Sequence, residues 1–261
     1  MPTPAIPLQQ PAQAAGSPTL PRQPKASGAA PIVAPCLPLR RERLAAPATL
    51  IAPAPAQRAP ELPAPGLLAT SERAALPGYA AALRTTALGW PRLDRWCLWV
   101  EPLSNPADPF QRRWLQAVEG ALEAWGELLP LVRVSDPAAA QLWIRRRRPP
   151  LATGPDGRQR ASHGRALLRL RAVEREPGLW RLEPAVELLI GPGQRTEALQ
   201  ATAVHELGHG FGLWGHSSDP ADALAVSAGA RPVLRPSSAD RATLRWLQDQ
   251  PTAFGAPLAG P

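Results

Sequence analysis

Proline is unevenly distributed along this chain of 261 residues, and its distribution limits where a folded core can form. Sixteen of the 35 prolines lie in residues 1–65, a segment rich in alanine and glutamine that shows no sustained hydrophobic period. Such a segment cannot bury enough apolar surface to offset the entropy lost on ordering. We therefore expect a disordered Pro/Ala-rich tail over 1–66, a folded domain over 67–255 and a C-terminal tail over 256–261.

Beyond the proline-rich segment, the hydrophobic pattern alternates between helical and extended stretches. Apolar residues recur every three or four positions from Trp114 to Leu129, which predicts an amphipathic helix over 109–129 with its tryptophans in the core. We expect further helices over 71–88 with an interruption near Pro77, over 194–210, and from an N-cap near Ser238, and strands over 93–100, 131–134, 141–144, 166–170 and 186–190. This order of elements predicts an α+β domain with one twisted sheet.

The net charge of +8 does not identify a nucleic-acid-binding protein. The sharpest basic cluster, Arg145–Arg148, has no interleaved aromatic residues and no accompanying nucleic-acid-binding signature, so we interpret it as a solvated strand end. No stretch approaches the roughly 18 apolar residues of a membrane span, and the N-terminus lacks the basic and apolar regions of a secretory signal. The two cysteines do not form a disulfide framework. We expect Cys97 in the core and Cys36 as a cysteine of the tail.

Three of the four histidines lie within the twelve residues from His205 to His216. The first part of this run, His205-Glu206-Leu207-Gly208-His209, follows the pattern H-E-x-x-H. At about 100° per residue, His209 lies about 40° around a helix from His205, and Glu206 lies about 100° from it. Two imidazoles on one face can therefore bind a single Zn²⁺, while the carboxylate can take a proton from a water activated by the metal.

A catalytic zinc site needs a third protein ligand. No glutamate follows Glu206, which leaves as candidates His216 and the aspartates Asp219, Asp222, Asp240 and Asp249. We favour His216, because imidazole is the better zinc ligand and because three glycines could break the helix with positive φ and turn the chain back toward the metal: Gly210, Gly212 and Gly215.

The segment HELGHGFGLWGHS, residues 205–217, resembles the signature of metzincin zinc endopeptidases and, with Ser217 after the third histidine, that of their matrixin branch. The resemblance is strongest over about 195–225. It implies a zincin domain with one twisted mixed sheet, a long helix packed on it, an active-site helix and a C-terminal helix. The substrate would be an extended polypeptide bound along an edge strand. In this sequence the implied zinc ligands are His205, His209 and His216, the implied general base is Glu206, and the implied turn glycine is Gly212.

The sequence departs from the matrixin pattern at two places. Three residues separate Gly212 from His216 where the family has two, and Leu224 stands where the family has the methionine beneath the metal. One interpretation is therefore an active zinc endopeptidase with Glu206 as general base. An alternative is a degenerate relative that binds zinc and acts as a binding module without proteolysis. A basic nucleic-acid-binding protein is a third and more remote interpretation.

The resemblance also bears on cofactors, partners and compartment. It implies one catalytic Zn²⁺. A second, structural zinc is not expected, because His163 is the only histidine left for it, and we expect His163 to be solvated. The family often binds calcium, but the short motif at Asp219–Ala223 does not assign such a site. A polypeptide substrate is the expected partner, and the resemblance favours a secreted or periplasmic protein.

Overall fold

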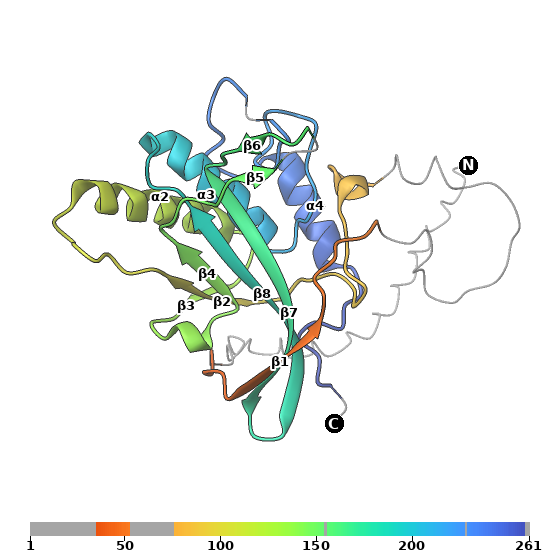
Figure 1. The fold of residues 1–261 in the computed structure, drawn as a ribbon. Coiled ribbons are helices and arrows are strands. Elements are labelled where there is room, and N and C mark those ends of the chain that lie inside the picture. The colour runs from red at the N-terminus through yellow and green to blue at the C-terminus, as the bar shows by residue number, and fades with distance from the viewer. Residues whose placement is uncertain (1–34, 53–75, 154–155, 228, 259–261) are drawn as a thin grey trace, which may run out of the picture. The chain divides into compact units, whose positions relative to one another are not determined.

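The fold is built on a mixed six-stranded sheet with the strand order β1-β7-β8-β4-β2-β3 (Figure 1). The strands β2, β3, β4 and β8 run parallel, β7 is antiparallel to β8, and β1 is antiparallel to β7. The computed structural model describes residues 35–52, 76–153, 156–227 and 229–258. Within these ranges the protein has three α-helices and a mixed sheet, so the expected α+β class is confirmed at this level.

The strands of the large sheet are β1 (Arg41–Ala46), β2 (Trp96–Val100), β3 (Leu131–Arg133), β4 (Leu142–Arg145), β7 (Gly164–Glu176) and β8 (Leu179–Ile190). A separate two-stranded sheet consists of β5 (Ala152–Thr153) and β6 (Gln159–Arg160). The α-helices are α2 (Pro109–Gly126), α3 (Thr196–Gly210) and α4 (Ser238–Gln248), and the short 3-10 helices are η1 (Ala80–Ala82) and η2 (Pro137–Ala139).

Helix α2 confirms the expected amphipathic helix and ends three residues earlier than the pattern predicts. The side chain of Asp108 accepts a hydrogen bond from the Phe110 N–H, and proline occupies the first turn, where its missing N–H costs nothing. The buried indoles of Trp114 and Trp125 donate to the carbonyls of Ile190, at 3.1 Å, and Val204, at 3.0 Å. These bonds tie α2 to β8 and to α3, which lies beside it (Figure 1).

The helix expected over 71–88 is wrong where the structure describes it, from residue 76 onward: only η1 is helical there. Gly78 adopts a φ of +58° and packs against α4 so closely that a Cβ would collide with the Thr243 hydroxyl and the Ala239 carbonyl. The next residue, Tyr79, donates its backbone N–H to Thr243 Oγ1 at 3.0 Å. Packing against a distant helix therefore overrides the local helical pattern.

The expected N-terminal tail is wrong for residues 36–52, which we call the N-terminal arm. The arm contains β1, which pairs with residues 170–174 of β7, and it continues to Ile51, which exchanges two backbone hydrogen bonds with Thr85. The rest of that expected tail, apart from Pro35, lies outside the described residues. At the other end, Leu258 donates to the Trp180 carbonyl and Pro257 bridges to Arg181, so these two residues of the expected C-terminal tail contact β8.

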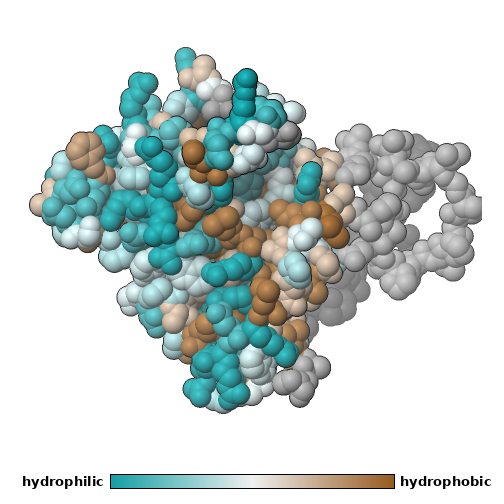
Figure 2. Space-filling model, in the orientation of Figure 1, coloured by the Kyte–Doolittle hydropathy of each residue, from teal (hydrophilic) through white to brown (hydrophobic). Residues whose placement is uncertain are grey.

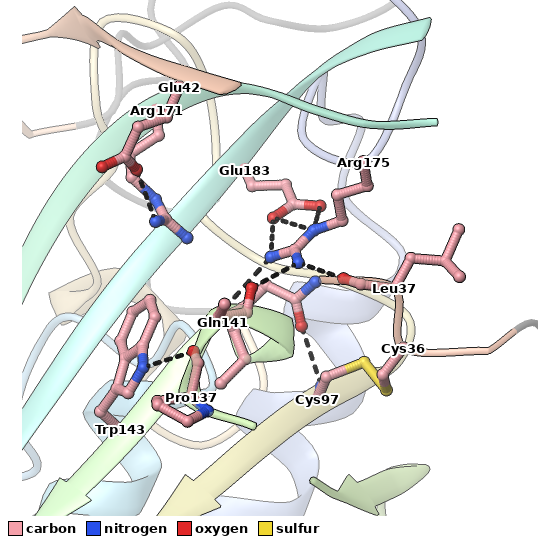
Figure 3. A network of polar contacts seen from close by, with 12 residues as sticks. Cys36, Leu37, Glu42, Cys97, Pro137, Gln141, Trp143, Arg171, Arg175 and Glu183 are labelled. Carbon is pink, nitrogen blue, oxygen red and sulfur yellow. Dashed lines mark hydrogen bonds and ion pairs between the residues drawn. A yellow bond between two sulfur atoms is a disulfide. The ribbon is translucent and has the colours of Figure 1, made fainter. Parts of the chain in front are cut away.

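The N-terminal arm is fastened to the sheet at its first residues (Figure 3). Cys36 forms a disulfide with Cys97 of β2, which corrects the expectation of two unpaired cysteines, although Cys97 does lie in the core. Arg175 donates to the Leu37 carbonyl at 2.5 Å and forms a buried ion pair with Glu183 at 3.0 Å. A covalent bond and a buried guanidinium thus compensate for the low apolar content of the arm.

The surface carries its charges without one dominant basic cluster. Arg145 forms an ion pair with Glu187, and Arg146 forms one with Glu101 at 3.7 Å, so half of the four-arginine run at the end of β4 is neutralised. On the face shown in Figure 2, hydrophobic residues gather near the middle and hydrophilic ones around them. No helix in the described ranges has the length and apolar character needed to cross a lipid bilayer.

Candidate metal centre

Helix α3 presents three of the predicted site residues. His205 and His209 lie one turn apart, with ring centroids separated by 4.9 Å, and Glu206 lies between them in sequence. The opposite side of the helix is anchored in the core, where Leu199, Val204 and Leu207 are fully buried. The spacing of the H-E-x-x-H pattern therefore places its side chains as helical geometry predicts.

The turn after α3 is a Schellman motif centred on Gly212. The Leu213 N–H bonds to the Gly208 carbonyl and the Gly212 N–H bonds to the His209 carbonyl, both at 3.0 Å, and Gly212 has a φ of +104°. The expectation of a glycine turn is therefore confirmed at Gly212. It is wrong in detail for Gly210, which remains helical, and for Gly215, which lacks a positive φ. Gly215 is needed for space instead, because a Cβ there would lie 2.5 Å from the Ala82 carbonyl oxygen.

The turn returns His216 to the two helical histidines. One ligand atom from each of His205, His209 and His216 lies within 4.8 Å of the others, close enough for one metal ion. In the described ranges this is the only group of three or more potential metal ligands, so the four candidate aspartates are not part of the cluster. His163 lies outside it as well and is exposed, as expected.

Backbone carbonyls orient both helical imidazoles. Nδ1 of His205 is 2.8 Å from the Ala223 oxygen, and Nδ1 of His209 is 2.8 Å from the Leu213 oxygen. Because a carbonyl can only accept, each Nδ1 must carry the proton, and each Nε2 keeps its lone pair. Metal-binding histidines are commonly held in this way, so the donor set fits a metal that prefers imidazole, such as zinc.

A buried carboxylate that sequence reasoning treated only as a possible ligand has a different place in the structure. Asp240 is fully buried and accepts hydrogen bonds from the backbone N–H groups of Ala223 and Ser237, both at 2.8 Å, and from the Tyr79 hydroxyl at 2.7 Å. Burial, and next the charge of Asp240, raise the pKa of Tyr79. Asp240 thus fixes the segment whose carbonyl orients His205, a role that no local sequence pattern reveals.

Ser217 and Leu224 support the same segment from either end. The Ser217 hydroxyl donates to Asp222 at 2.5 Å, and its backbone N–H donates to the Leu224 carbonyl at 2.8 Å. Leu224 is fully buried against α3, where any Cβ on Gly208 would collide with its side chain. The position expected for the matrixin methionine is therefore filled by an apolar side chain of similar size, beneath the turn of α3 that carries the histidines.

Burial is the largest cause of the pKa shifts of Glu206 and of the three histidines. It raises the pKa of Glu206 to about 8, against the lowering effects of the Ala166 N–H and the Arg165 charge. It lowers the pKa of His209 to about 3, helped by the neighbouring His205, and it also lowers the pKa values of His205 and His216. All three imidazoles are thus neutral near pH 7, the form in which histidine binds metals.

A second residue missed by sequence reasoning is Gly164, the first residue of β7. A Cβ at this position would lie 2.5 Å from Glu206 Oε1, so the glycine provides the space that the carboxyl group occupies. It is distant from the histidine motif in sequence, and no local signal marks it.

The three histidines and Glu206 line a cleft of about 500 Å³. Arg165 and Ala166 of β7 line one part of it, and the other lining residues come from the N-terminal arm, from the segment around η1 and from the turn after α3: Leu50, Ala82, Arg84, Trp214 and Gly215. The inner edge of β7 pairs with β8, and its outer edge pairs with β1 only over residues 170–174, so in the described ranges the outer edge beside the cleft has no strand partner. The site therefore combines three histidines close enough to hold one metal ion, a buried acid and an open strand edge. A scan against models of protein families and a comparison with curated proteins find no match to this chain.

Proposed function

We propose that this protein is a zinc-dependent endopeptidase that hydrolyses peptide bonds of polypeptide substrates. The observation that carries the proposal is the convergence of His205, His209 and His216 beside the buried carboxyl group of Glu206 in one open cleft. The resemblance of residues 205–217 to the matrixin signature agrees with this arrangement. The metal would be held by the three histidines, and zinc bound there supplies a Lewis acid that polarises the scissile carbonyl and activates water.

Glu206 would serve as the general base and then as the general acid. Its side chain lies on the same helix as two ligands, one residue after His205, and Gly164 gives its carboxyl group room. In the carboxylate form it accepts a proton from the attacking water, and it passes this proton to the amine that leaves. A strand-like substrate would add to the free edge of β7 near Ala166, so that main-chain hydrogen bonds hold it in the cleft.

The disulfide supports the expected compartment. Disulfides persist mainly in oxidising environments such as the bacterial periplasm and the extracellular space. The Cys36–Cys97 bond therefore favours a secreted or periplasmic protein, as the matrixin resemblance implies.

The first test measures zinc content and casein hydrolysis in parallel. Wild-type protein should bind one zinc per chain, lose casein hydrolysis on chelation and regain it when zinc is added. Glu206→Gln should keep the zinc and lose about 10²–10⁴-fold in kcat/KM, because only the proton transfer is removed. His216→Ala should lose zinc as well.

The results separate the two interpretations. Stoichiometric zinc without hydrolysis of casein or of peptide libraries would contradict the endopeptidase and support a zinc-dependent binding module. Wild-type protein without zinc would refute both.

A further inference from the structure

The cleft at the histidine cluster contains two arginines from different segments. Arg165 belongs to β7, and its charge acts on the carboxyl group of Glu206. Arg84 follows η1, and its backbone N–H donates to the Trp214 carbonyl at 2.8 Å, next to the turn that carries His216. Both residues line the cleft. One arginine is thus near the acid and the other is near the third histidine.

In the ranges that the structure describes, no ion pair joins Arg84 or Arg165 to an acidic side chain. Some of the other described arginines form ion pairs, as in Arg171–Glu42 at 2.7 Å and Arg175–Glu183 at 3.0 Å. Among the described residues that line the cleft, Glu206 is the only one with a carboxyl group. Arg84 and Arg165 therefore give the described lining of the cleft an excess of positive charge.

Unpaired arginines in a partly enclosed cleft favour a ligand that bears carboxylates. The guanidinium group is planar, stays protonated and can donate two parallel hydrogen bonds to a carboxylate. A cleft with one sign of charge also concentrates oppositely charged ligands and speeds their association. A substrate with a basic side chain next to Arg84 or Arg165 would instead be repelled by the positive charge of the arginine.

We propose that the cleft selects acidic polypeptide segments, with carboxylates near the scissile bond that pair with Arg84 and Arg165. This inference rests on the proposed endopeptidase function and adds a substrate class to it. The carboxylate can come from an internal Asp or Glu side chain or from the free C-terminus of a short peptide. The proposal requires only that this carboxylate lies near the scissile bond at the histidine cluster.

The test uses quenched fluorescent peptides that differ only in charge. One peptide carries Glu at the three positions on each side of its centre, a second carries Gln there and a third carries Lys. Each is made with a free and with an amidated C-terminus, so that the two carboxylate sources are distinguished. We expect kcat/KM to be about tenfold higher for Glu than for Gln, lowest for Lys, and to fall for Glu as salt is added.

Charge reversal at one arginine tests the assignment. In Arg84→Glu the preference for Glu over Gln should disappear or reverse. The matched control is Arg112→Glu, which makes the same change of net charge at an exposed position on α2 and should keep the preference. A preference that falls equally in Arg84→Glu and Arg112→Glu would show that net charge, rather than the cleft, is responsible, and a preference that stays at the wild-type level in Arg84→Glu would refute the role of Arg84.

A binding measurement keeps this proposal separate from the proposed function. The arginines belong to the chain whether or not metal is bound, so the metal-free protein should bind the labelled Glu peptide about tenfold more tightly than the Gln peptide by fluorescence anisotropy. Equal binding and equal hydrolysis of the two peptides would overturn the acidic specificity and leave the endopeptidase intact. A binding preference without zinc or hydrolysis would support the specificity and refute the enzyme.

Discussion

At the scale of single residues, the site combines side chains that a local motif identifies with others that only the fold brings together. His205, Glu206 and His209 could be predicted because helix geometry fixes their relative directions within five residues. His216 could be favoured because a glycine turn precedes it, and the structure brings it to the other two. Gly164 could not be predicted, because its role depends on how β7 lies against α3.

Gly164 gives a test of how tightly the acid is positioned. In Gly164→Ala the new methyl group would lie 2.5 Å from Glu206 Oε1, so the carboxyl group must move. A displacement of about 1 Å at a catalytic group can cost about 10²-fold, and we expect a loss of that order in kcat/KM with zinc content unchanged. Metal analysis and peptide hydrolysis measure the two quantities on the same preparation.

The control for this prediction is Gly126→Ala, at the end of α2. The nearest atom to a Cβ there is Leu131 Cδ1 at 3.9 Å, an ordinary contact, so activity should not change. Wild-type activity in Gly164→Ala would contradict the assigned position of the Glu206 carboxyl group.

At the scale of elements, the sequence predicted the three α-helices from local patterns, but an equally local pattern over 71–88 failed where packing against α4 overrides it. The helical period of α2, the motif on α3 and the Ser/Asp N-terminus of α4 lie within their own segments, and all three helices are present. The N-cap of α4 is Ser237, one residue before the expected one, and it forms a capping box with Asp240. By contrast, β1 was missed because its pairing partner is β7, more than a hundred residues later in the chain.

The start of α4 also positions one of the three clustered histidines. Asp240 lies in its first turn and accepts the backbone N–H of Ala223, whose carbonyl orients His205. Asp240→Asn replaces one accepting oxygen by a donor in a fully buried place. We expect zinc affinity to fall about 10–100-fold, as for other residues that orient ligands, and the free energy of unfolding to fall by about 1–3 kcal/mol.

Two comparisons show whether this effect acts through the ligand. Asp249→Asn changes an aspartate at the C-terminal end of the same helix, outside the cluster, and should leave zinc affinity unchanged. Tyr79→Phe removes one donor to Asp240 and keeps its bonds to Ala223 and Ser237, so it should weaken zinc less than Asp240→Asn does. Wild-type zinc affinity in Asp240→Asn would refute the positioning role, even if the protein were less stable.

At the scale of the whole molecule, the N-terminal arm connects the edge of the sheet to the cleft. It begins at the disulfide to β2, continues as β1 along β7 and reaches the cleft at Leu50. The high proline content of this segment led to the expectation of a disordered tail. Composition shows that a segment has few apolar residues, but it does not show which bonds the segment forms with distant residues. The ordering entropy of the arm is opposed by the covalent bond to Cys97, the guanidinium of Arg175 and the sheet pairing.

The contribution of the disulfide can be measured directly. Cys36 and Cys97 are separated by 61 residues, and closing a loop of such length lowers the entropy of the unfolded chain. Loss of the bond should therefore lower the free energy of unfolding by about 2–4 kcal/mol. Cys36→Ser should lose this amount, and Cys97→Ser and the double variant should lose more, because they also place a hydroxyl group at a buried position. Urea unfolding with and without reductant supplies the control: reductant should destabilise the wild type and leave Cys36→Ser unchanged. If reductant leaves the wild type unaffected as well, the arm is not held by this bond, and the argument from the disulfide to an oxidising compartment fails with it.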